Sequence, residues 1–168
     1  MTDTIRIASA AELDVDVARR LILGSEPWRT LGYGECEVDA LVRGASAGRI
    51  LVARAGDRVV GFALSQPAFL LGEYLKLLVI DPAERSRSIG RQLMAELERC
   101  AFERWPNVYL CVSDFNAGAQ RFYRRLGYEE VGVLHDFFLP GKGEVLMRKS
   151  IGAWRHFEHN ATRMTPRS

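Results

Sequence analysis

The spacing of hydrophobic and polar positions along the chain predicts strands and helices in a definite order. Apolar residues recur at every fourth position from Ile89 to Ala101, which is typical of a helix that buries one stripe. Two apolar stretches joined by Gly56-Asp57 indicate a β-hairpin, because both residues favour tight turns. The same patterns predict strands at 4–8, 50–55, 58–66, 73–80, 107–112, 128–135 and 144–149, and helices at 10–23, 36–44, 87–104 and 117–126.

This order of elements predicts an α/β protein of the α+β type. We expect a mixed, mostly antiparallel central sheet of about seven strands, flanked by about four helices. The helix at 87–104 lies between two strands and is expected to form a parallel crossover. A chain of 168 residues is long enough for one domain, which we assign to 1–151, with 152–168 as a polar C-terminal tail.

The composition narrows the class of protein. Hydrophobic residues make up 48% of the chain and charged residues 26%, as in ordinary globular proteins, and a net charge of +2 does not indicate a nucleic-acid partner. The cysteines Cys36, Cys100 and Cys111 are too few and too widely spaced for a disulfide framework or a zinc site, so we expect no metal. Without a signal-peptide pattern or an apolar run of membrane length, we expect a cytoplasmic protein that does not contact a membrane.

The turn before the helix at 87–104 carries the first chemical indication. An apolar strand ends at Asp81-Pro82 and is followed by Arg85-Ser86-Arg87-Ser88-Ile89-Gly90. Backbone amides that open a helix bind anions, and three arginines, the third being Arg91, add positive charge beside them. This layout suits a pyrophosphate bound mainly by backbone, although solvated arginines on an ordinary turn would give the same pattern. The chain has no P-loop motif and no dinucleotide fingerprint after its first strand.

A second motif follows the strand at 107–112. The stretch 114–128 reads DFNAGAQRFYRRLGY, which is similar to the signature N-x-x-[AS]-x-x-[FL]-Y-x-x-x-G-[FY] of the GNAT superfamily of acetyl-CoA-dependent N-acetyltransferases. The turn at 85–90 resembles the [QR]-x-x-G-x-[GA] motif of the same superfamily, with Ser88 where the motif has its first glycine. With the order of elements, the resemblance covers roughly residues 4–150.

The resemblance implies a function and a donor substrate. A GNAT enzyme moves an acetyl group from acetyl-CoA to a primary amine by direct attack in a ternary complex. The turn would bind the CoA pyrophosphate, and the strand before it would pair with the pantetheine arm through its backbone. The residues that the resemblance implies for cofactor binding are Leu78, Val79, Ile80, Arg85, Ser86, Arg87, Ser88, Ile89, Gly90, Arg91, Asn116 and Tyr123.

Acetyl transfer to an amine requires two proton movements. An alkylammonium with a pKa of about 10 must lose a proton before it attacks, and the leaving thiolate benefits from a proton donor. We expect Tyr123 to be that donor, although a purely packing role is the alternative. The resemblance suggests Glu73 as a general base acting through water, although it is equally consistent with a solvated carboxylate. Tyr74 and His135 are weaker candidates for the base.

The acceptor is expected to lie among aromatic side chains. These side chains could bind an apolar group or a cation through their ring faces, or could simply cover the edge of the sheet. The sequence alone does not distinguish a protein N-terminus, a lysine, a polyamine or an aminoglycoside-like antibiotic. The candidate lining residues are Trp28, Tyr33, Phe69, Phe137 and Phe138.

Two other functions stay open at this point. One is a non-catalytic, acyl-CoA-binding regulatory protein, which the replacement of a motif glycine by Ser88 leaves possible. The other is a nucleic-acid-binding module that uses Arg121, Arg124 and Arg125 on one exposed face. A homodimer is also possible, because we expect the strand at 144–149 to lie at the edge of the sheet.

Overall fold

The structure is a computed structural model that describes residues 4–45, 47–85 and 87–157. No helix within these residues is long and apolar enough to cross a membrane. The elements in chain order are β1 (Ile5–Ala10), α1 (Val15–Leu23), α2 (Glu35–Ala45), β2 (Arg49–Ala55), β3 (Arg58–Phe69), β4 (Gly72–Ile80), η1 (Pro82–Glu84), α3 (Ile89–Ala101), β5 (Asn107–Ser113), α4 (Ala117–Arg125), β6 (Glu129–His135) and β7 (Gly143–Ser150).

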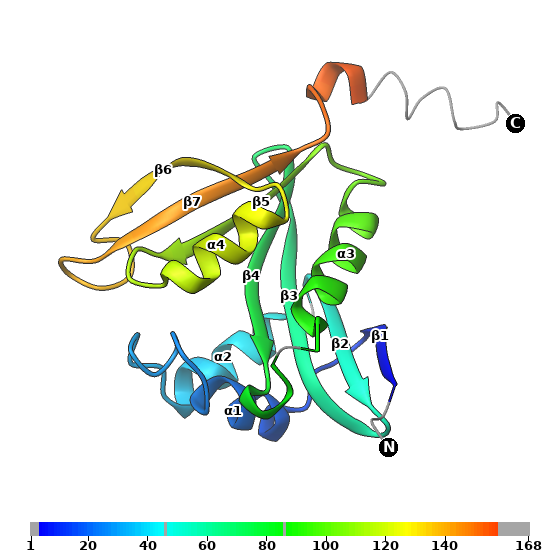
Figure 1. The fold of residues 1–168 in the computed structure, drawn as a ribbon, viewed down its shortest axis with the longest axis vertical. Helices are drawn as coiled ribbons and strands as arrows, with labels where there is room; N and C mark the ends of the chain where they lie inside the picture. Colours follow the sequence, from blue (N-terminus) through cyan, green and yellow to red (C-terminus); the bar gives the residue numbers. More distant parts are fainter. Residues whose placement is uncertain (1–3, 46, 86, 158–168) are drawn as a thin grey trace, which may run out of the picture.

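The strands form one seven-stranded sheet in the order β1-β2-β3-β4-β5-β7-β6. All neighbours are antiparallel except β4 and β5, which run parallel and are connected through α3 (Figure 1). The predicted mixed, mostly antiparallel sheet and its parallel crossover are therefore confirmed. The predicted edge strand is wrong, because β7 lies between β5 and β6. A homodimer formed through an edge of this sheet would use β1 or β6.

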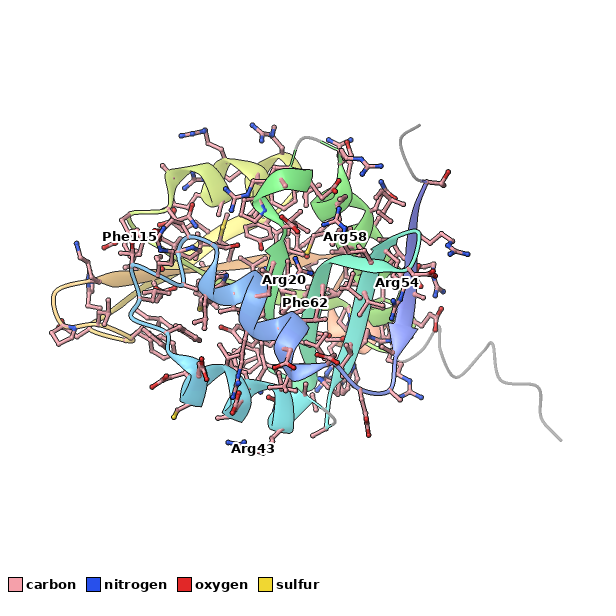
Figure 2. All side chains as sticks on the ribbon, turned by 90° about the horizontal axis from the view of Figure 1, so that it is seen from below. Arg20, Arg43, Arg54, Arg58, Phe62 and Phe115 are labelled. Atoms are coloured by element: carbon pink, nitrogen blue, oxygen red, sulfur yellow. The ribbon has the colours of Figure 1, made fainter. Side chains whose placement is uncertain are left out.

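Helices cover both faces of the sheet. Successive residues of a strand point to opposite faces, so each strand contributes apolar side chains to both. On β2, Ile50 and Val52 pack with α1 and α2, whereas Leu51 and Ala53 pack with α3. Phe62 on β3 is fully buried on the same side as α1 (Figure 2). The fold thus has one hydrophobic core on each face of the sheet.

The first helix begins later than its apolar pattern predicts. Asp14 is its N-cap, and the Asp14 carboxylate accepts hydrogen bonds from the backbone amides of Asp16 (2.9 Å) and Val17 (3.0 Å). A cap of this kind satisfies amides that the first turn of a helix leaves without partners, and so sets where the helix starts. The helix therefore runs over Val15–Leu23 rather than 10–23.

A gap in the sheet positions the functional site. β4 pairs with β5 only from Gly72 to Leu75, and beyond this point the strands diverge (Figure 1). At the same point β4 carries a β-bulge, because Ser65 lies opposite Leu75 and the next residue of β3, Leu64, lies opposite Leu77. The extra residue is Lys76. A bulge bends its strand and increases the local twist, which directs the end of β4 away from β5.

Candidate active site

Two cavities open where β4 and β5 diverge. The larger, called here the α3 cavity, has a volume of about 640 Å³ and lies between β4, the first turn of α3 and α4. The smaller, called here the aromatic cavity, has a volume of about 350 Å³ and lies between β4, β5, the loop before α2 and the turn between β6 and β7. The two cavities adjoin, because six residues line both: Pro27, Trp28, Leu78, Asn116, Ala119 and Tyr123.

Backbone amides at the start of α3 line the α3 cavity and have no hydrogen-bond acceptor among the residues that the structure describes. The first hydrogen bond of this helix joins the amide of Gln92 to the carbonyl of Ser88 (3.0 Å), so the preceding amides have no acceptor within the helix. At Gly90 the backbone approaches α4 closely, since an added Cβ would lie 3.3 Å from Cζ of Phe122. Arg91 lines the cavity on the same turn. Amides at a helix start, close backbone approach and positive charge are together the features expected of an anion-binding site.

The structure brings most of the predicted cofactor-binding residues together around this cavity. Ser86 lies outside the described residues. Arg87 does not line the cavity, because its guanidinium pairs with the carboxylate of Glu84 (2.5 Å). The remaining ten residues line it: Leu78, Val79, Ile80, Arg85, Ser88, Ile89, Gly90, Arg91, Asn116 and Tyr123.

Two carboxylates, those of Glu26 and Glu84, also line the α3 cavity. Hydrogen bonds from Arg87 and Arg58 lower the pKa of Glu84, so it remains ionised. Arg58 also pairs with Asp81 (3.2 Å), and Arg20 on α1 donates to the same carboxylate at 2.9 Å. This network gives the negative charge of Glu84 cationic partners and so limits its repulsion of a bound anion.

Tyr123 stands where the two cavities meet. Its helix, α4, begins at Asn116, whose side-chain oxygen accepts a hydrogen bond from the amide of Ala119 (3.1 Å). This use of the oxygen leaves the Asn116 side-chain NH₂ as the donor for a ligand. Tyr123 is 8% exposed and packs edge-on against Phe122 and Tyr128. Burial raises the pKa of the Tyr123 phenol, so the hydroxyl keeps its proton at neutral pH.

Glu73 lies outside both cavities. It is 1% exposed, and its carboxylate accepts hydrogen bonds from Nε of Arg49 (3.0 Å) and Oγ of Ser65 (2.5 Å). The carboxylate is therefore engaged in a buried network between β2, β3 and β4. This position does not support the predicted role of Glu73 as a general base.

Aromatic side chains line the smaller cavity largely as predicted. Trp28, Tyr33, Phe137 and Phe138 line it, and the rings of Tyr33 and Phe138 stack with centroids 5.5 Å apart. This contact joins the loop before α2 to the turn between β6 and β7. Phe69 is not part of the lining, since it packs against Tyr74 and Tyr109 instead.

The carboxylate of Glu144 also lines the aromatic cavity, and the sequence patterns did not single it out. Glu144 is 8% exposed, and its Oε1 accepts a hydrogen bond from Oγ of Ser113 (2.6 Å) on the neighbouring strand. Burial raises the pKa of the Glu144 carboxyl. Tyr74 and Cys111 lie in the same lining, and burial raises the pKa of both. The only signal in the sequence was a charged residue directly before the apolar run Val145–Met147.

Comparison with known proteins decides the family. Residues 46–130, about half of the chain, match the model of the acetyltransferase (GNAT) domain. The chain belongs to the GNAT acetyltransferase family. It is an acetyl-CoA-dependent N-acetyltransferase. This assignment favours an enzyme over the non-catalytic, acyl-CoA-binding regulatory protein.

Relatives and solved structures agree with this assignment. N-alpha-acetyltransferase RimI of Mycobacterium tuberculosis is 29% identical over 159 residues, which cover 90% of this chain and 96% of the relative. The ribosomal-protein-S18-alanine N-acetyltransferase from Escherichia coli has a TM-score of 0.75 at 18% identity and covers 89% of this chain and 96% of its own. An aminoglycoside 6'-N-acetyltransferase complexed with coenzyme A has a TM-score of 0.72 at 22% identity and covers 88% of this chain and 98% of its own. At these identities the two structures show the shared fold.

The GNAT acetyltransferase has one further cation in its α3 cavity that sequence reasoning did not assign to the cofactor. Arg125 lines the cavity from the last turn of α4. Helical spacing offered a signal, because Gly118, Phe122 and Arg125 follow one another at i, i+4 and i+7 and so share a face. Arg124 pairs instead with Glu130 (3.4 Å). Arg121, Arg124 and Arg125 therefore do not form one exposed set of unpaired cations, which a nucleic-acid-binding face would require.

Ser88 occupies a backbone conformation that suits glycine. Its φ of 58° and ψ of 17° lie in the left-handed region, and its side chain makes no capping hydrogen bond. We expect Ser88→Gly to raise the free energy of unfolding by about 0.5–1 kcal/mol, because relief of this strain exceeds the added entropy of the unfolded chain. Chemical denaturation measures the change, and calorimetry with CoA shows whether affinity rises with it. Ser88→Ala keeps the Cβ and is the control; a gain in stability from both variants would contradict the role of strain.

Proposed function

We propose that this GNAT enzyme acetylates the α-amine at the N-terminus of a peptide or protein. The observation that carries the proposal is the meeting of two different cavities at Tyr123: one has an anion-binding turn, and the other has aromatic walls and a carboxylate. An acetyl donor bound in the first cavity would meet an amine bound in the second cavity beside Tyr123, and the two would react there. The name of the M. tuberculosis relative, an N-alpha-acetyltransferase, supports an α-amine. We also propose that the enzyme acts in the cytoplasm.

The lining of the aromatic cavity favours a peptide over an antibiotic. Among the described residues, Glu144 is the only carboxylate of that lining. One carboxylate matches the single ammonium of a peptide N-terminus, whereas a polycationic aminoglycoside would leave several charges without partners. The apolar rings of Trp28, Tyr33 and Phe138 suit the uncharged body of a peptide.

In the α3 cavity, we propose that backbone groups of Leu78, Val79 and Ile80 bind the pantetheine arm of acetyl-CoA. The free amides at the start of α3 would bind its pyrophosphate, with Arg85, Arg91 and Arg125 supplying positive charge. Asn116 would donate from its side-chain NH₂ to the arm. This arrangement holds the donor beside the amine, which lowers the entropic part of the barrier to direct attack.

Two side chains would then move protons. Tyr123 would donate its phenolic proton to the departing thiolate as the thioester bond breaks, and would be reprotonated by the second proton that the nitrogen of the new amide releases; its burial keeps the phenol protonated until then. Glu144, in place of Glu73, would take a proton from the ammonium of the acceptor. Because burial raises the pKa of Glu144, this carboxylate is a stronger base than an exposed one.

We expect Glu144→Gln to lower kcat/KM by about 10²-fold, because the amine loses its proton acceptor. The raised pKa of Glu144 keeps the carboxyl protonated at low pH, so the wild-type activity rises as pH rises through that pKa. The variant should lose this inflection from its pH profile of kcat/KM. Glu73→Gln is the comparison and should retain the inflection. If Glu73→Gln removes the inflection and Glu144→Gln does not, the base is Glu73.

The test of the proposed function is release of CoA thiol from acetyl-CoA with three acceptors. These are a peptide with a free α-amine, the same peptide blocked at its N-terminus but carrying a lysine, and an aminoglycoside. We expect release with the first peptide, and mass spectrometry should place the acetyl group on its α-amine. Release with the aminoglycoside alone would contradict the proposal, and release with the blocked peptide alone would reassign the acceptor to lysine.

A further inference from the structure

The aromatic cavity has two charges of opposite sign. Among the described lining residues, Lys76 on β4 is the single cation and Glu144 on β7 the single anion. The other lining residues are apolar, aromatic or neutral polar groups. An acceptor with one ammonium would pair with the carboxylate of Glu144. Lys76 would then face the same substrate without a partner of opposite charge.

Lys76 is the residue that the β-bulge adds to β4. Its side chain is exposed and makes no hydrogen bond or ion pair within the part of the chain that the structure describes. By contrast, Arg49 binds Glu73, and Lys149 binds Glu98 at 2.6 Å. Lys76 is therefore available to a ligand, and the bulge is what puts it at the cavity.

We propose that Lys76 selects acceptors that carry an acidic side chain next to the reacting N-terminal residue. This inference rests on the proposed function, since it names the class of peptide that the same site would take. With its α-amine at Glu144, the peptide would direct the carboxylate of its second residue to Lys76. The specificity would come both from attraction of this carboxylate and from repulsion of a second cation.

The spacing of the two charges favours the second residue over a free amino acid. Lys76 and Glu144 lie on strands that flank β5, so their backbones are at least two strand spacings apart, together about 10 Å, and the divergence of β4 from β5 adds to this distance. Two residues of extended peptide span about 7 Å, and the flexible lysine stem covers the remainder. The amine and carboxylate of a free amino acid sit on one carbon and cannot reach both charges.

The test uses three peptides that differ only at the second position, where they carry Glu, Gln or Lys after an N-terminal alanine. We expect kcat/KM to fall in that order, by about tenfold from the acidic to the basic peptide, with most of the change in KM. Free alanine, compared with its amide, is the fourth arm and should show no advantage of the carboxylate.

Three variants test whether Lys76 causes the preference for an acidic second residue. Lys76→Glu should reverse the order of the peptides, and Lys76→Gln should reduce the difference between them. Arg6→Glu makes the same change in net charge on β1, an edge strand three strands away from β4, and should keep the wild-type order. If Lys76→Glu does not fold, Lys76→Gln and a loss of preference at high salt in the wild type test the same point.

The outcomes separate this inference from the proposed function. Equal kcat/KM for the three peptides would overturn the role of Lys76 while leaving peptide acetylation intact. An acidic preference that persists in Lys76→Glu would also overturn it. Thiol release with a small amine and with none of the peptides would contradict the proposed function and this inference together.

Discussion

Tyr123→Phe is expected to lower kcat by about 10²–10³-fold while binding of acetyl-CoA stays close to that of the wild type. The substitution removes the proton donor for the leaving thiolate and keeps the ring that packs against Phe122 and Tyr128. Turnover is measured by thiol release with a peptide acceptor, and binding of acetyl-CoA by calorimetry. A loss of turnover without a loss of acetyl-CoA binding is the informative result, because a packing role for Tyr123 would leave turnover unchanged.

Tyr128→Phe is the matched control for this experiment. Tyr128 is 2% exposed and lies beside Tyr123, with ring centroids 5.7 Å apart, yet it lines neither cavity. Its hydroxyl should be dispensable for turnover. If Tyr123→Phe matches the wild type in kcat, the proposed proton donor is wrong. If it loses acetyl-CoA binding instead, Tyr123 acts in binding rather than in proton transfer.

Arg49→Met is expected to lower the free energy of unfolding by about 3 kcal/mol, the largest effect on stability that we predict. The variant leaves the carboxylate of Glu73 almost fully buried, with Ser65 as its remaining side-chain partner. An unpaired buried charge costs far more than the loss of a surface ion pair. Denaturant titration by circular dichroism measures the change in stability.

Two further variants complete this test. Adding Glu73→Gln to Arg49→Met should restore part of the stability, because the double variant buries no unpaired charge. Arg99→Met removes an exposed pair with Glu96 and Glu103 and should change stability far less than Arg49→Met does. A loss in Arg49→Met as small as that of Arg99→Met would mean that solvent screens the buried pair. Folded Arg49→Met should retain kcat, since Glu73 lines neither cavity.

Local pattern was sufficient for the order of the elements and for the turn that opens α3. Both depend on neighbours within a few residues: the apolar stripe of α3, the small residues before it, and the motif from Asn116 to Tyr123. The structure extends these predictions by bringing Asn116 and Tyr123 to the gap between β4 and β5. Asp14 is a local signal that could have been used, because an aspartate is a common N-cap.

Long-range contacts explain what the sequence patterns did not predict. Glu73 starts a strand and resembles an exposed carboxylate, but Arg49, from a strand 24 residues earlier, reaches it and the sheet buries it. Glu144 reaches the acceptor side only because β7 inserts between β5 and β6, against the expectation of an edge strand. The availability of Lys76 depends on a bulge that becomes visible only in the pairing of β3 with β4.

The gap between β4 and β5 also has a consequence for the lifetime of the folded protein. The two halves of the sheet are joined by pairing over four residues of each strand, Gly72–Leu75 with Asn107–Leu110. A donor bound along the free part of β4 would act as an additional strand across this seam. Any ligand that binds only the folded state stabilises it, by about 2.7 kcal/mol at a hundredfold excess over its Kd. Resistance to proteolysis would then follow the supply of acetyl-CoA, which would tie the abundance of the enzyme to the metabolic state of the cell.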